Sequence, residues 1–384
     1  MNKQPVKVLF FTTRLGKGGA EKLLLRIINN LDSEKFRLYL ALCQTGGEYE
    51  GDLAKNIEVY TLVNRQKIAI SILLSWFPLR RLIKDLQPDL VCGILDNVNV
   101  IAILATLGLV NQPKTVLSVH APLSFKYSYQ VKQRLFNKLI YGLIPHTYPF
   151  ADSIICVSNG VAEDLSNLIP KTKNLLQVIY NPCVDEEVLT GAQQTPPETL
   201  PDGCKLIVAC GRLNPEKGFK DLITALVSVR KVINAHLWII GDGELKSELL
   251  EQIDSLGLTD LVKLLGFKMN PYQYMAKADL FVCASIYEGF GNVIVEAMAC
   301  ETPVVSTDCP YGPREIIDSG VNGLLIQPPG DPGVLAEGII QVLTNDDLQK
   351  RLIQEGKKRA EDFQTDKISQ KYASLFLSKI NEIA

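Results

Sequence analysis

The length and composition of this sequence are typical of a soluble globular chain with two ordinary domains. It has 384 residues, of which 47% are hydrophobic and 21% are charged. No stretch reaches the roughly 18 apolar residues of a membrane span. The nine cysteines form no C-x-x-C pair, which argues against a disulfide framework or a zinc site. We therefore expect a cytoplasmic protein in a reducing compartment.

The small net charge of −2 hides a difference between the two halves of the chain. Residues 1–180 carry 21 Lys and Arg against 13 Asp and Glu, a net charge of +8, whereas the remainder carries −10. Electrostatic attraction should therefore draw the first half to anionic surfaces.

The first half alternates strand-like with helix-like segments. The apolar run Val8–Phe11 is typical of a buried strand rather than of a secretory leader. Residues 18–31 place their leucines and isoleucines on one helical face, and residues 98–110 suit a buried helix. Further strands are predicted at 37–43, 89–95, 114–120, 153–160 and 175–181. This alternation predicts a parallel sheet covered on both faces.

A polar segment with three prolines, residues 191–203, separates this half from a second alternating pattern. Strands are predicted at 205–211, 235–243, 262–267, 280–285 and 303–307, with helices at 219–232, 292–299 and 346–384. We therefore predict two doubly wound α/β domains facing across a cleft. The predicted divisions are a domain at 1–190, a linker at 191–203, a domain at 204–365 and a final helix at 366–384 that returns to the first domain.

A glycine-rich turn follows the first strand. Gly16, Gly18 and Gly19 precede a helix, and the start of a helix suits a phosphate group. The third glycine of the dinucleotide fingerprint is replaced by Glu21, and the P-loop spacing is absent. A tight turn without a ligand is an equally good interpretation of this stretch alone.

Two cations flank a proline-containing turn after the strand at 205–211. Arg212 and Lys217 lie five residues apart, so together they could clamp a diphosphate, with Arg supplying a planar fork. On local sequence alone, two solvated surface cations are equally plausible.

The stretch "EGFGNVIVEAMA" contains the strongest signal. Gly289 and Gly291 precede a helix, Glu288 lies beside its start, and Glu296 lies within it on an apolar face. Backbone N–H groups at a helix N-terminus bind anions, and carboxylates accept hydrogen bonds from sugar hydroxyls. The combination predicts a nucleotide-sugar, which carries hydroxyls at both ends of a diphosphate.

These residues resemble a known family. "ASIYEGFGNVIVEAMACETPVVSTD" resembles the E-x7-E signature of retaining GT-B glycosyltransferases of family four, also called group 1. "GRLNPEKG" and "GKGGAEK" are similar to the family's diphosphate-binding turn and N-terminal glycine loop. The resemblance spans nearly the whole chain. "DCPYGPREII" looks like members that build bacterial cell-surface polysaccharides or lipid-linked oligosaccharides, and it favours a UDP-sugar over a GDP-sugar.

The resemblance implies a role for each matching residue. Glu288 would bind hydroxyls of the transferred sugar, Arg212 and Lys217 would neutralise the leaving diphosphate, and His120 would touch the sugar. The implied donor-binding residues are Gly18, Gly19, Phe267, Gly289, Phe290, Gly291, Asn292, Val293 and Glu296. Within this set, Glu296 would hold the ribose and the segment at Phe267 would lie near the base.

The resemblance also implies a retaining mechanism with an α-linked product. No D-x-D sequence occurs, so we expect neither a metal-bridged diphosphate nor any other cofactor. Two other classes remain open: a nucleotide-sugar epimerase of related fold and a non-catalytic nucleotide-sugar-binding protein. The complete set Arg212, Lys217, Glu288 and Glu296 favours the transferase.

The basic first half is the predicted acceptor side. Residues 71–84 and 125–144 combine aromatic and basic side chains, as interfacial amphipathic segments do. The expected acceptor is a saccharide or a polyprenyl-diphosphate-linked saccharide. We expect the enzyme itself to bind peripherally to the cytoplasmic face of the inner membrane. Ordinary amphipathic helices of a soluble domain are the alternative. No nucleic-acid-binding module is recognisable, so we expect no nucleic-acid partner.

Overall fold

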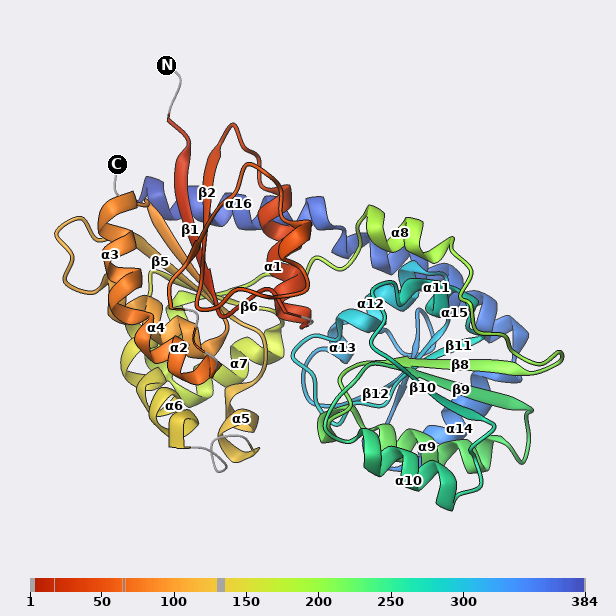
Figure 1. The fold of residues 1–384 in the computed structure, drawn as a ribbon. Coiled ribbons are helices and arrows are strands. Elements are labelled where there is room, and N and C mark those ends of the chain that lie inside the picture. Colours follow the sequence, from red (N-terminus) through yellow and green to blue (C-terminus); the bar gives the residue numbers. More distant parts are fainter. Residues whose placement is uncertain (1–3, 17, 64, 66, 130–134, 383–384) are drawn as a thin grey trace. The chain divides into compact units, whose positions relative to one another are not determined.

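The computed structural model describes residues 4–382 except 17, 64, 66 and 130–134. The chain divides into two compact units: Met1–Pro182 with Thr365–Ala384, and Cys183–Gln364. Both units are parallel α/β sheets with helices on both faces (Figure 1). The prediction of two doubly wound α/β domains is therefore confirmed.

The first unit contains a seven-stranded sheet in the order β3-β2-β1-β4-β5-β6-β7. Every pair of neighbouring strands runs parallel. The strands are β1 (Val6–Thr12), β2 (Phe36–Leu42), β3 (Glu58–Thr61), β4 (Leu90–Ile94), β5 (Lys114–Val119), β6 (Ser153–Cys156) and β7 (Leu176–Val178). The central strands are almost wholly apolar because both faces of the sheet are covered.

Helices of the first unit pack against both faces of this sheet. Buried side chains of α1 and α16 share one apolar core with the sheet, whereas α2, α3 and α6 pack around α4, which contacts β1, β4 and β5. The helices are α1 (Gly19–Asn30), α2 (Ile68–Leu74), α3 (Trp76–Leu86), α4 (Asp96–Thr106), α5 (Leu123–Tyr129), α6 (Leu135–Thr147), α7 (Asn159–Leu168) and α16 (Thr365–Asn381). In Figure 1, α16 is the blue helix beside β1 and β2.

The second unit contains a six-stranded parallel sheet in the order β10-β9-β8-β11-β12-β13. The strands are β8 (Lys205–Cys210), β9 (Ala235–Ile240), β10 (Val262–Gly266), β11 (Leu280–Cys283), β12 (Val304–Thr307) and β13 (Leu324–Ile326). Its strand order follows the same scheme as the first six strands of the other unit, with a reversal between the first and fourth strands. Ligands in open α/β sheets bind at the carboxyl ends of the strands beside such a reversal.

Two groups of helices cover the second sheet. Helices α9, α10 and α14 share its main apolar core, and α11 and α12 contact the strands and pack with α8 and α15. The helices are α8 (Glu186–Ala192), α9 (Phe219–Val229), α10 (Lys246–Ser255), α11 (Tyr272–Lys277), α12 (Asn292–Ala299), α13 (Pro313–Ile316), α14 (Pro332–Leu343) and α15 (Asp346–Ala360).

The first division of the chain lies earlier than the sequence suggests. The prediction ended the first domain at residue 190, but the first unit stops at Pro182, because α8 already packs on α11. Nor is the proline-rich segment a detached linker. Asn270 donates hydrogen bonds to the Gly191 carbonyl and to Gln194, and Lys268 Nζ lies 2.9 Å from Glu198 Oε1.

The helical pattern at 346–384 is interrupted in the structure. Helix α15 ends at Ala360 and α16 begins at Thr365, and the two belong to different units. At the interruption, the amides of Cys183 and Val184 both donate to the Phe363 carbonyl. The chain passes between units after Pro182 and after Gln364, and these hydrogen bonds join the residues next to the two passages.

Two short strands, β3 and β13, were not predicted. They have four and three residues and form edges of their sheets, where a continuous apolar run is not required. Among the described residues, no helix has both the length and the apolar character needed to cross a bilayer.

Candidate active site

The second unit brings the predicted cations and one predicted carboxylate to the reversal in its strand order. The loop after β8 carries Arg212 and Lys217, and the loop after β11 carries Glu288. Because β8 and β11 are adjacent and parallel, their carboxyl ends lie side by side. The loops therefore meet where an open α/β sheet binds its ligand.

The turn after β8 is fixed by Gly218. Its φ is +61°, and a Cβ there would lie 2.0 Å from the carbonyl oxygen of Ala284 in the loop after β11. Only glycine allows both the left-handed conformation and this close approach. The Ile286 amide also donates a 2.8 Å hydrogen bond to the Glu216 carbonyl. The two loops are thus joined through their backbones, and this junction positions Lys217.

Lys217 and Glu288 form an ion pair across this junction. Their side chains are only 22% and 11% exposed, and the Ser285 hydroxyl donates a 2.7 Å hydrogen bond to the same Glu288 oxygen. Burial by itself lowers the pKa of Lys217, but attraction to Glu288 outweighs it and raises that pKa above its usual value. Lys217 is therefore a fixed cation at neutral pH.

Arg212 differs from Lys217 in its surroundings. It is exposed, and the described residues give it no side-chain hydrogen bond or ion pair. Its neighbour Leu213 is held through its amide by the Asp242 carbonyl at 3.0 Å. A well-anchored backbone thus presents a guanidinium that can bind an anion.

The glycine turn after β11 leads into α12 as predicted. Gly291 has a φ of +103° and caps the helix. Phe290 is buried and packs edge-to-face on Phe363 at 5.4 Å. A Cβ on Gly312 would lie 2.3 Å from the Phe290 carbonyl oxygen. The turn is therefore held from both sides. This fixes the direction in which the positive end of the α12 helix dipole points.

The other predicted donor-binding residues of this unit lie near the same edge of the sheet. Asn292 and Val293 are half-buried at the start of α12, and Glu296 is buried within that helix. Burial, with a contribution from the Glu296 charge, raises the pKa of Cys300 to about 12. Phe267 is half-buried directly after β10.

The remaining predicted residues lie in the first unit. Gly18 caps α1, and a Cβ there would lie 2.0 Å from a carboxylate oxygen of Glu21, so an acidic side chain occupies the space beside the predicted phosphate turn. Gly19 is the first residue of α1. Lys17 of the same motif lies outside the described residues.

His120 follows β5, and one of its ring nitrogens, Nε2, lies 2.9 Å from the Ser118 hydroxyl. Burial, with a smaller contribution from the Lys126 charge, lowers the pKa of His120 to about 3. The imidazole is therefore neutral near pH 7.

Sequence reasoning missed Ser285 and the residues around His120. Ser285 is the second residue after β11. The only sequence feature that could have indicated its role is its position three residues before Glu288. Asp96 is a lone acid directly after the strand run at 89–95, a position that could have been flagged. Among the described residues, no group of three His, Cys, Asp or Glu side chains is arranged to hold a metal ion.

Two Rossmann-like parallel-sheet units, one of which carries cations and a carboxylate at its strand-order reversal, match the architecture of GT-B glycosyltransferases. Family models support this class over most of the chain: "Glycosyltransferase Family 4" matches residues 17–187, and "Glycosyl transferases group 1" matches residues 192–359. The chain belongs to the group 1 glycosyltransferases, as the sequence resemblance predicted.

Relatives and solved structures agree with this family. The chain is 32% identical over 369 residues to an N-acetylgalactosamine-N,N'-diacetylbacillosaminyl-diphospho-undecaprenol 4-alpha-N-acetylgalactosaminyltransferase of Campylobacter jejuni, covering 94% of this chain and 97% of the relative. A second C. jejuni relative, an alpha-1,4-N-acetyl-D-galactosaminyltransferase acting on a diphospho-undecaprenol-linked saccharide, is 26% identical over 96% of this chain and 98% of its own length. The structure of Anabaena HepE with UDP and glucose has a TM-score of 0.77 at 25% identity, covering 97% and 100% of the two chains.

Proposed function

We propose that this glycosyltransferase is a retaining enzyme that transfers a sugar from a UDP-sugar to a polyprenyl-diphosphate-linked saccharide and forms an α-glycosidic bond. The observation that carries this proposal is the Lys217–Glu288 ion pair, which joins two adjacent loops that also carry Arg212 and the glycine turn of α12. Two cations and a helix N-terminus suit a diphosphate, and a carboxylate beside them suits sugar hydroxyls.

The comparisons support the finer parts of the proposal. HepE was solved with UDP and glucose, which favours UDP as the nucleotide. Both C. jejuni relatives are named for α-transfer to diphospho-undecaprenol-linked saccharides, which favours a lipid-linked acceptor and an α-configured product.

The proposed mechanism needs little acid–base chemistry. The bond from the anomeric carbon to the donor phosphate breaks, and Arg212, Lys217 and the α12 N-terminus stabilise the negative charge that develops on the diphosphate. The acceptor hydroxyl attacks from the face that the diphosphate leaves, and its proton passes to the departing phosphate. Glu288 holds hydroxyls of the sugar, and Glu296 holds the ribose. Because two cations neutralise the diphosphate, we propose that transfer needs no metal ion.

On the acceptor side, we propose that α2 and α3 of the first unit bind the cytoplasmic surface of an anionic membrane. Six large apolar side chains are exposed over ten residues: Ile68, Ile70, Leu73, Leu74, Trp76 and Phe77. Arg81 lies on the following turns, paired with Asp85 at 3.8 Å. Apolar side chains beside basic ones are typical of interfacial helices.

One residue of the predicted membrane surface needs revision, and part of that surface lies outside the described residues. Arg80 donates to the carbonyls of Ala105 and Leu107 at 2.9 and 2.8 Å, so it holds the end of α4 rather than a lipid. In the second predicted segment, Lys132 and Arg134 lie outside the described residues. The α2–α3 surface is therefore the better-supported part.

The proposal is tested by measuring nucleotide release from a panel of donors: UDP-glucose, UDP-galactose, their N-acetylated 2-amino forms, and GDP-mannose. Each donor is incubated with detergent-solubilised undecaprenyl-diphosphate-linked saccharides, with and without a chelator. We expect release of UDP from one donor class, resistant to chelator, together with an α-linked product. In the Glu288→Gln and Arg212→Ala variants, turnover should fall by about a hundredfold or more.

Matched controls are Glu248→Gln and Lys220→Ala, which alter an exposed ion pair in the same unit; both should keep wild-type rates. Release of GDP, inhibition by chelator, or a β-linked product would each contradict the corresponding part of the proposal. Donor binding without release from any donor would contradict transfer itself.

A further inference from the structure

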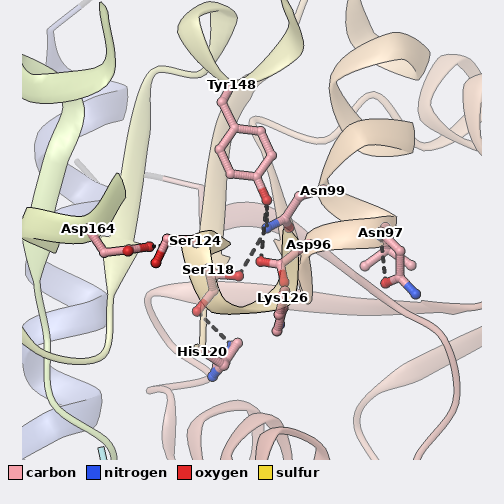
Figure 2. Close-up of polar contacts among 10 residues, drawn as sticks. Asp96, Asn97, Asn99, Ser118, His120, Ser124, Lys126, Tyr148 and Asp164 are labelled. Carbon is pink, nitrogen blue, oxygen red and sulfur yellow. Dashed lines mark hydrogen bonds and ion pairs between the residues drawn. The ribbon is translucent and has the colours of Figure 1, made fainter. Parts of the chain in front are cut away.

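A connected polar network lies at the carboxyl ends of β4 and β5 in the first unit (Figure 2). Asp96, the first residue of α4, is only 2% exposed and pairs with Lys126 of α5. Asn99 of α4 donates to the Ser118 carbonyl at 3.0 Å and to the Tyr148 hydroxyl at 3.2 Å. The Tyr148 hydroxyl in turn lies 3.5 Å from Asp96. The network therefore joins the starts of two helices to the end of β5.

Stability alone does not account for this network. A buried ion pair gains little over an apolar replacement of similar volume, because removing both charges from water costs several kcal/mol. The residue before Asp96, Leu95, has a φ of +94° and a ψ of 144°, a conformation that costs a non-glycine residue of order 1–3 kcal/mol. An expensive ion pair and a strained residue thus occur together at the edge where ligands bind.

The network extends to His120 through Ser118 (Figure 2). Ser118 contributes its carbonyl to Asn99 and places its hydroxyl 2.9 Å from His120 Nε2. Lys126 lies six residues after His120 and is close enough for its charge to act on the imidazole. At the start of α5, the Ser124 amide donates a 3.2 Å hydrogen bond to the carboxylate of Asp164 of α7. The segment from His120 to Lys126 is thus held at both of its ends and in its middle.

We propose that Asp96 and Lys126 are positioning residues for His120: their ion pair fixes α5 on α4 and so fixes the loop that carries the imidazole. This inference rests on the proposed function and on the role that the family resemblance implies for His120, contact with the transferred sugar. Asp96 is too buried to meet a substrate, so it acts through Lys126. A misplaced catalytic group reduces turnover more than it reduces binding.

The test compares Lys126→Met with Lys114→Met. Lys114 begins the same strand, β5, at its opposite end and pairs with Asp152 at 2.9 Å, with side chains 20% and 25% exposed. Both variants lose one partly buried lysine from an ion pair. In the panel reaction with the donor that releases UDP fastest, we expect kcat to fall by about tenfold to a hundredfold in Lys126→Met only. The KM for that donor should change little, and Lys126→Arg should recover most of the rate.

Double variants separate positioning from a purely structural role. Because Lys126 acts through His120, the double variant with Lys126→Met and His120→Gln should have nearly the same kcat as His120→Gln alone. Asp96→Asn, which keeps the side-chain volume, should lower kcat as Lys126→Met does. It serves as the second variant if Lys126→Met does not fold.

A readout independent of turnover is the rate at which diethyl pyrocarbonate modifies His120, followed by peptide mass spectrometry. We expect the rate to rise by about threefold or more in Lys126→Met, because a less restrained loop opens more often. It should remain at the wild-type value in Lys114→Met. If the wild-type enzyme releases no nucleotide, the proposed function fails. The modification rate alone then tests whether Lys126 positions His120.

Three results would overturn the inference. One is an unchanged modification rate in Lys126→Met. Another is an equal loss of kcat in Lys126→Met and Lys114→Met. The third is a double variant in which Lys126→Met lowers kcat by the same factor in the His120→Gln background as in the wild type.

Discussion

Lys217 and Glu288 lie 71 residues apart in the sequence, yet in the structure each is the other's charge partner. The sequence resemblance assigns them to different parts of the donor, the diphosphate and the sugar. Their ion pair lets Lys217 stay charged in a partly buried position. A bound donor would therefore meet a site whose charges are already held in place.

Gly218 offers a direct test of the junction that holds this pair. We expect Gly218→Ala to lower the free energy of unfolding by about 2 kcal/mol or more, because it combines a positive φ with a clash against the Ala284 carbonyl. It should also weaken donor binding by displacing Lys217. Urea unfolding and donor titration measure the two effects.

Gly203→Ala is the matched control. Gly203 has a φ of +73°, but its Cβ would meet nothing within 4 Å, so only the conformational cost of about 1 kcal/mol should appear. Equal losses in the two variants would contradict the role given to the contact with Ala284.

His120 makes a pH-dependent contribution to stability. Its pKa is about 3 in the folded chain and about 6.5 when unfolded. Below about pH 6.5 the unfolded state therefore binds a proton that the folded state does not, and stability falls as the pH drops toward the folded pKa. Between about pH 7 and pH 5, wild type should lose up to about 2 kcal/mol more than His120→Gln, as measured by urea unfolding.

The control for this prediction is His146→Gln, because His146 is exposed. It should keep the wild-type dependence on pH. A His120→Gln variant that loses as much stability as wild type would show that His120 is protonated equally well in both states.

At the scale of elements, α2 and α3 are unusual in leaving large apolar side chains in water. Phe77 is 66% exposed and Trp76 is 43% exposed. If this surface binds lipid, Trp76→Ser with Phe77→Ser should strongly reduce flotation of the protein with vesicles that contain anionic lipid. Stability should change little, since neither side chain is part of the core.

The control surface is Val110, which is fully exposed between α4 and β5. Val110→Ser should leave flotation unchanged. Flotation that is equal in wild type and the double variant, or absent in wild type, would contradict membrane binding through these helices.

At the scale of the molecule, α16 completes a unit whose other elements lie more than 180 residues earlier. Phe376 is fully buried and packs edge-to-face on Phe10 at 6.0 Å and on Phe36 at 6.4 Å. We expect Phe376→Ala to lower the free energy of unfolding by about 3–5 kcal/mol. Peptide-resolved hydrogen exchange should show lost protection in β1 and β2, with β8 and β9 unchanged.

Phe281→Ala is the control: it removes a buried phenylalanine from the core of the other unit. Phe281 is fully buried in β11 of the second unit, and its removal should lower protection in β8 rather than in β1. Equal loss of protection across both units in the Phe376 variant would mean that α16 does not belong to the first unit alone.

Much of this molecule was readable from the sequence by itself. Parallel strands buried on both faces leave long apolar runs, and the glycine turn with Glu288 and Glu296 is local in sequence. The two doubly wound domains and the family could therefore be predicted. The edge strands β3 and β13 escaped detection because three or four half-exposed residues carry no clear pattern.

Only the tertiary structure decided which charged groups meet. Arg80 looked like a lipid-binding residue until the carbonyls at the end of α4 were seen to hold it. Asp96 and Lys126 lie 30 residues apart, and their pairing depends on β4 and β5 ending side by side. Side-chain partners are chosen by distances in space, and the sequence records only distances along the chain. The sequence pattern at 346–384 did not reveal the break between α15 and α16, although it led to the prediction that the last helix returns to the first domain.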